Sequence, residues 1–160
     1  MLLVIAVTVP AFSQAPVVAS ADPESLFTSP DPKLNANKQV VLHIVRDLLE
    51  ANHWENADKY LSERYTQHNP WVASGLAPVK RFFGSRPSSP IPAKMKTKVV
   101  SVVAEGDLVV VGYRQEFVDP RNQGKCYTTT WFDMWRILDG KADEHWDPAT
   151  LTPPATKPCE

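Results

Sequence analysis

Two short polar stretches, far apart in the chain, contain side chains suited to proton transfer. YTQHNP, at 65–70, supplies Tyr65, His68 and Asn69, and EHWDP, at 144–148, supplies His145 and Asp147. Side chains alternate along a strand, so His145 and Asp147 are expected on one face. If the two stretches meet, their imidazole and carboxylate groups could form a general acid/base pair. The competing interpretation is structural: a hydrogen-bonded turn at His68 and ordinary polar groups at an exposed strand end.

A carboxylate between two tryptophans is a further candidate. Strand alternation places Trp131, Asp133 and Trp135 on one face of a central strand. If that face lines a pocket, burial would favour the neutral acid and suit Asp133 to proton transfer. Equally, Asp133 could pair with an arginine of a neighbouring strand, such as Arg114.

Other chemistries have weaker support in the sequence. The chain contains neither a GxSxG nucleophile motif nor a glycine-rich phosphate-binding loop. A zinc site formed by His68, His145 and Asp147 is conceivable from the ligand types, but nothing in their spacing requires it. We therefore predict no metal and no organic cofactor.

The elements that must position these residues follow from hydrophobic periodicity. Helices are predicted over 37–52, with Asn37 as cap, over 54–64 and over 76–83. From residue 95 the period becomes two, which predicts antiparallel strands within 96–107, 108–117, 125–138 and 141–147. Asp139–Gly140 is a strong hairpin signal. The fold class is therefore α+β: three helices packed on a curved antiparallel sheet, a cone-shaped barrel with room for a small ligand.

Length, charge and the N-terminal segment set the organisation of the chain. With 160 residues and a net charge of −1, the chain fits one domain and gives no reason to expect nucleic-acid or membrane-surface binding. Residues 2–12 are apolar, and small-residue sequences follow, so 1–21 is predicted as an export signal and the mature protein as periplasmic or secreted. The alternative is an unusual apolar arm. A linker at 22–36, a domain at 37–152 and a Pro-rich tail at 153–160 complete the organisation.

The two cysteines, Cys126 and Cys159, leave two alternatives open. In an oxidising compartment they could form a disulfide between the tail and a strand. Two free structural thiols are nearly as consistent with the sequence. Their spacing matches neither a metal-binding motif nor a redox pair.

Three segments resemble the markers of SnoaL-like proteins, which include polyketide cyclases within the nuclear-transport-factor-2-like superfamily. They are YTQHNPWVASGLAPVKRFF, VVSVVAEGDLVVVGY and FDMWRILDGKADEHWD, and the resemblance extends over 34–152. It implies a curved sheet on three helices, a pocket inside the cone and often a homodimer through the outer face of the sheet. It further implies that Tyr65, His68, Asp133, His145 and Asp147 occupy the positions of interest. Relatives commonly carry histidine where this chain has Gly112, so a base would be missing if that position faces the pocket.

The resemblance also implies acid/base chemistry without a cofactor. A base would remove a proton alpha to a carbonyl, the enolate would attack a second carbonyl, and a pocket acid would protonate the new alkoxide. The expected reaction is an aldol-type condensation, isomerisation or hydration of a small, partly apolar carbonyl compound. His68 and Asp133 are the predicted proton-transfer residues, with His145 and Asp147 assisting. The predicted substrate-binding residues are Tyr65, Asn69, Trp131 and Trp135. The alternative function is a non-catalytic periplasmic domain that binds a small ligand in the same cone.

Overall fold

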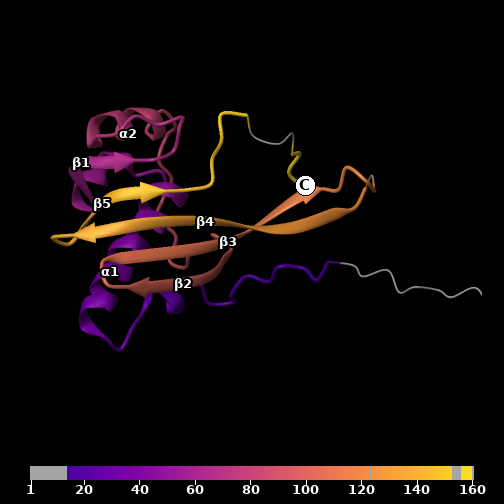
Figure 1. Cartoon of the computed structure of the whole chain (residues 1–160), viewed down its shortest axis with the longest axis horizontal. Helices are drawn as coiled ribbons and strands as arrows, with labels where there is room; N and C mark the ends of the chain where they lie inside the picture. The colour runs from indigo at the N-terminus through magenta and orange to yellow at the C-terminus, as the bar shows by residue number, and fades with distance from the viewer. Residues whose placement is uncertain (1–13, 123, 153–155, 160) are drawn as a thin grey trace, which may run out of the picture.

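The computed structural model describes residues 14–122, 124–152 and 156–159 (Figure 1). Most of the predicted export signal, at 1–13, lies outside the described residues, as do 153–155 and 160 of the predicted tail. The described residues form a five-stranded sheet in the order β1-β5-β4-β3-β2, with helices packed against its inner face. The predicted α+β class is confirmed.

The first helix begins earlier than predicted. It runs as α1 (Pro32–His43) and continues as a π-helical segment, η2 (Ile44–Glu50). The cap is Asp31, whose carboxylate accepts the backbone N–H of Leu34 at 2.9 Å, and proline suits the first turn. Asn37, the predicted cap, is instead buried within the helix and donates to the carbonyl of Gly106.

The segment predicted as a linker also contributes to the core. A 3-10 turn, η1 (Glu24–Phe27), precedes α1, and the Phe27 side chain is fully buried. Prolines and aspartates in 22–36 therefore flank short packed elements and do not indicate a detached linker.

The predicted helix over 54–64 is wrong in its second half. A 3-10 helix, η3 (Trp54–Lys59), is followed by a strand, β1 (Leu61–Gln67). This strand pairs in parallel with β5 (Lys141–Trp146), with Gln67 opposite His145. The pairing satisfies backbone groups through residues 75 or more positions away, and so it overrides the local helical spacing. The sheet is consequently mixed, and the prediction of a wholly antiparallel sheet holds only for the other four strands.

The remaining elements agree with the prediction. An antiparallel meander comprises β2 (Val99–Glu105), β3 (Leu108–Val118), β4 (Cys126–Leu138) and β5. Asp139 and Gly140 have φ values of 49° and 74°, as a type I′ hairpin turn requires. Helix α2 (Leu76–Phe83) lies against β1, at the edge of the sheet, and against η3, with Leu76 and Val79 buried.

The two faces of the sheet differ in character. The inner face packs on the helices and contributes Val109, Val111 and Trp135 to the core. The outer face carries exposed apolar side chains, with Val103 at 61% and Phe132 at 51% exposure. Within the described ranges, no helix is both long and apolar enough to cross a membrane.

Strands β3 and β4 extend beyond the sheet as a long hairpin that meets the C-terminal segment (Figure 1). The N–H of Val118 donates to the carbonyl of Lys157 at 2.8 Å, and Phe117 forms a β-bridge with Pro158. Cys126 and Cys159 form a disulfide, with their α-carbons 6.3 Å apart. Of the two alternatives left by the sequence, the structure has the disulfide.

Candidate active site

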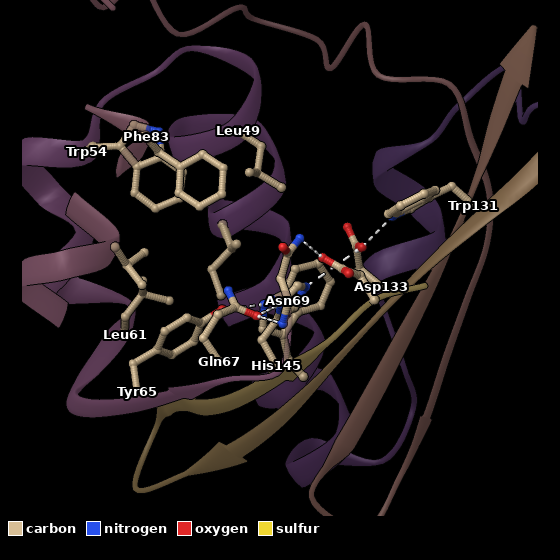
Figure 2. Close-up of a pocket in the computed structure, with 14 residues that line it drawn as sticks. Leu49, Trp54, Leu61, Tyr65, Gln67, Asn69, Phe83, Trp131, Asp133 and His145 are labelled. Carbon is tan, nitrogen blue, oxygen red and sulfur yellow. Dashed lines mark hydrogen bonds and ion pairs between the residues drawn. The ribbon is translucent and has the colours of Figure 1, made fainter. Parts of the chain in front are cut away.

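A pocket of about 190 Å³ lies on the inner face of the sheet, between the strands and the helices. Its walls come from the π-helical segment, η3, β1, α2, β4 and β5, together with the chain that follows β1 and β5. Figure 2 shows the side chains that line it: Ile44, Leu49, Trp54, Leu61, Tyr65, Gln67, Asn69, Val79, Phe83, Trp131, Asp133, Trp135, His145 and Asp147.

One end of the pocket is apolar. The rings of Trp54 and Phe83 stack with their centroids 4.7 Å apart, and Leu49 and Leu61 lie beside them (Figure 2). These side chains come from helical segments and the start of β1, so the helices supply this end. A hydrocarbon part of a ligand would be desolvated here.

The opposite end is polar and contains a histidine and two carboxylates. Asp133, His145 and Asp147 each present one atom, and these atoms all lie within 4.8 Å of one another. His145 Nε2 is 3.7 Å from Asp133 Oδ1. Trp135 and His145 are direct neighbours across β4 and β5, which explains why alternate residues of the two strands converge here.

The orientation of the His145 ring is fixed by Gln67. Gln67 Oε1 accepts the backbone N–H of Asn69 at 3.0 Å and lies 2.7 Å from His145 Nδ1. Because a backbone N–H can only donate, the shared Gln67 atom is the oxygen, and His145 Nδ1 must carry a proton. In the neutral ring, the lone pair therefore lies on Nε2, the nitrogen that is 3.7 Å from Asp133 Oδ1.

Each carboxylate is also held by a hydrogen-bond donor. Asp147 accepts the Asn69 Nδ2 amide at 2.7 Å and the backbone N–H of Ala149 at 2.9 Å. The Asn69 amide is oriented in turn, because its Oδ1 accepts the N–H of Trp71. Asp133 accepts the Trp131 indole N–H at 2.7 Å. The polar end is thus a fixed arrangement and not a set of free side chains.

Two buried phenols lie near this cluster. Tyr65 Oη accepts the indole N–H of Trp135 at 3.1 Å, and burial raises the Tyr65 pKa. Burial also raises the Tyr113 pKa, and the nearby Asp133 charge adds to the effect. Among the described residues, the enclosed Tyr113 Oη makes no hydrogen bond. Both phenols stay protonated at neutral pH.

The structure places nearly all of the sequence-predicted site residues in this pocket. Those brought together are Tyr65, Asn69, Trp131, Asp133, Trp135, His145 and Asp147. The suggested partner of Asp133, Arg114, pairs instead with Glu116 at 2.8 Å.

His68 does not belong to the pocket. Its ring stacks on Trp146 with centroids 5.1 Å apart, and its Nε2 lies 2.8 Å from Glu144 Oε1. Glu144 and Trp146 alternate with His145 along β5, so these contacts lie on the outer face of the sheet. The hydrogen bond with His68 holds the Glu144 pKa below its usual range. The prediction that His68 is a pocket base is therefore wrong, because its ring lies on the outer face and does not line the pocket.

Gln67 and Tyr113 are not among the residues predicted from the sequence. Strand alternation over 61–67 places Gln67 on the same face as Tyr65, but the hydrophobic spacing of 54–64 predicts a helix there. Gly112, expected to matter if it faced the pocket, lies on the other side of β3. A Cβ at Gly112 would meet Phe132 and Ser101, which are outer-face residues. A histidine there would not be a pocket base.

Comparison with known proteins gives a family and a fold. A model described as the SnoaL-like domain matches residues 42–145. A candidate polyketide cyclase from Acidithiobacillus ferrooxidans is 19% identical with a TM-score of 0.52, covering 75% of this chain and 89% of its own. An NTF2-like protein of unknown function from Burkholderia pseudomallei is 16% identical with a TM-score of 0.51, covering 72% and 91%. Comparison with curated protein sequences finds no match.

Proposed function

Because this chain belongs to the SnoaL-like family, we propose that its pocket transfers protons to and from a small, partly apolar carbonyl compound without a cofactor. One observation carries the proposal: a buried histidine is grouped with two carboxylates at the polar end of an otherwise apolar pocket, with its Nε2 3.7 Å from Asp133 Oδ1. A candidate polyketide cyclase with the same fold supports the reaction class only by analogy.

The proposed chemistry assigns His145 as the base. Its neutral Nε2 takes the proton alpha to the carbonyl, which leaves an enolate and an imidazolium. Asp133 and Asp147 stabilise that imidazolium, as opposite charges a few ångströms apart do in a partly desolvated site. In a condensation, the enolate then attacks a second carbonyl, and the imidazolium returns its proton to the alkoxide that forms. In an isomerisation, the imidazolium returns the proton to another carbon of the same molecule. Nδ1–H remains bound to Gln67 throughout.

The size of the pocket limits the substrate. A cavity of about 150 Å³ is sufficient to hold a benzene molecule. The pocket here is about 190 Å³, so it suits a carbonyl compound of about one ring better than an extended polyketide chain. We propose that the ring lies between Trp54, Phe83 and the leucines, with its carbonyl toward Asn69 and His145.

Deuterium exchange tests this function without knowledge of the natural substrate. A panel of single-ring ketones and 1,3-dicarbonyl compounds in D2O would be followed by proton NMR, with EDTA present. The wild type should accelerate loss of the alpha-proton signal for a subset, and Asp133→Asn should reduce that rate by about 100-fold or more. Full exchange activity in the Asp133→Asn variant would remove Asp133 from the mechanism, and absence of exchange across the panel would contradict the proposed reaction class.

The alternative is a non-catalytic domain that binds a small ligand in the same pocket. It is favoured by the aromatic character of the pocket, which includes Trp54, Trp131 and Trp135. Quenching of tryptophan fluorescence by panel compounds, without any deuterium exchange, would select this function over the enzymatic one.

Export and self-association also remain proposals. The Cys126–Cys159 disulfide supports a periplasmic or secreted location, because such bonds persist in oxidising compartments. The exposed Val103 and Phe132 on the outer face are where the homodimer implied by the family resemblance would form. Light scattering of the purified mature chain would test the dimer.

A further inference from the structure

We infer that Asp133, His145 and Asp147 also form a binding site for a divalent first-row transition-metal ion, with Zn²⁺ as the best match. This inference does not rest on the proposed function. It concerns the same three side chains but a different use of the lone pair on His145 Nε2.

The donor atoms have the right types and spacing. One imidazole nitrogen and two carboxylates present atoms within 4.8 Å of one another. Zinc binds such nitrogen and oxygen ligands at about 2.0–2.2 Å, so tetrahedral ligands lie about 3.4 Å apart. His145 Nε2 and Asp133 Oδ1 are already 3.7 Å apart, and small side-chain rotations would bring the set together.

The histidine provides an independent sign of a ligand. Its side chain is only 9% exposed, and Nε2 makes no hydrogen bond among the described residues. The hydrogen bond between Nδ1–H and Gln67 leaves Nε2 as the nitrogen with the lone pair. A ring nitrogen that opens to the pocket, lies 3.7 Å from a carboxylate oxygen and makes no hydrogen bond among the described residues is available for coordination.

The hydrogen-bond partners of the three side chains follow the pattern of metal sites. Ligating histidines usually donate their second N–H to an oxygen, and ligating carboxylates are themselves hydrogen-bonded. Here Gln67 Oε1 accepts from His145, Asn69 donates to Asp147, and Trp131 donates to Asp133. These contacts would hold the ligands in place before an ion arrives and lower the cost of binding it.

The site would hold the ion with three protein ligands and leave a coordination position toward the pocket, as in catalytic zinc sites. An imidazole ligand disfavours Mg²⁺ and Ca²⁺, which prefer oxygen ligands alone. A bound ion would coordinate through the Nε2 lone pair, so that lone pair could not accept a proton. Metal binding and the cofactor-free proton transfer therefore exclude each other. We therefore expect Zn²⁺ to inhibit the exchange activity and EDTA to restore it.

Isothermal titration calorimetry of the full chain, purified without a polyhistidine tag and freed of metal, tests the site directly. Both cysteines are in the disulfide, so thiols do not compete for zinc. The wild type should bind one Zn²⁺ per chain and Mg²⁺ much more weakly. Gln67→Ala should weaken Zn²⁺ binding about 10- to 100-fold, because His145 loses the hydrogen bond that orients its ring. His145→Gln should weaken binding further.

His68→Gln is the matched control, because it removes a histidine paired with a carboxylate on the outer face. Zinc affinity in this variant should equal that of the wild type. If His145→Gln fails to fold by circular dichroism, Asp147→Asn replaces it, with the same expected loss. Absence of saturable binding in the wild type, or equal losses in His68→Gln and the pocket variants, would overturn the inference. Metal binding without exchange activity would leave the site standing and refute the proposed function alone.

Discussion

Replacing Gln67 with leucine should release His145 from its single tautomer. Gln67 Oε1 accepts both His145 Nδ1–H at 2.7 Å and the Asn69 N–H at 3.0 Å. A hydrogen bond contributes about 0.5–1.5 kcal/mol net, so its loss should change the tautomer ratio by about twofold to tenfold. Two donors also lose their acceptor, at a combined cost of about 2 kcal/mol because the pocket admits some water. The corresponding fall in Tm is roughly 4–8 °C.

Two-bond proton–nitrogen NMR on ¹⁵N-histidine-labelled protein measures the tautomer. In the wild type, neutral His145 should carry its proton on Nδ1, and in Gln67→Leu the Nε2-protonated form should become visible. Gln67→Glu is the control, because a carboxylate keeps the acceptor and should preserve the Nδ1–H form. A wild-type spectrum with the proton on Nε2 would refute the assignment of the base atom.

Three further outcomes follow from other parts of the molecule. Asp47→Asn should lower the free energy of unfolding by about 2 kcal/mol at pH 7. Burial raises the pKa of Asp47, but hydrogen bonds from Arg46 and His43 outweigh it and hold the pKa below its usual range. This stabilisation is therefore present at neutral pH and is lost on acidification below about pH 4, so urea titrations of wild type and variant should converge there. Cys126→Ser should lower the free energy of unfolding by about 2–4 kcal/mol in the same titration, because the disulfide closes a loop with a sequence separation of 33 residues. The wild type with its disulfide reduced should show the same loss. Gly112→Ala should leave deuterium exchange unchanged, because its new methyl group lies on the outer face; a large loss would mean that Gly112 affects the pocket.

Where local sequence determined an element, the prediction was accurate. The alternation of Trp131, Asp133 and Trp135 placed them together on one face, and Asp139–Gly140 forms the expected turn. Strand alternation is a property of consecutive residues, and a type I′ turn needs only two adjacent residues that adopt positive φ. Both features can therefore be predicted from local sequence.

The errors arose where a distant partner decides the structure. Residues 61–67 form a strand because β5 pairs with them, and their local sequence pattern does not predict a parallel edge strand. Once that strand is known, alternation places Tyr65 and Gln67 inward and His68 outward. The helix predicted in place of this strand therefore accounts both for the wrong prediction of His68 and for the absence of Gln67 from the predicted site. The enclosed hydroxyl of Tyr113 is a result of packing alone, which local sequence does not predict.

We expect proton transfer to depend on His145, on the inner face, and not on His68, on the outer face. The most direct test compares His145→Gln with His68→Gln in the deuterium-exchange assay, using the compound that the wild type exchanges fastest. His145→Gln should lose about 10²- to 10⁴-fold in rate, the range expected for removal of a general base, while His68→Gln stays within about twofold of the wild type. A large loss in His68→Gln with activity retained in His145→Gln would show that the base is His68 and not His145.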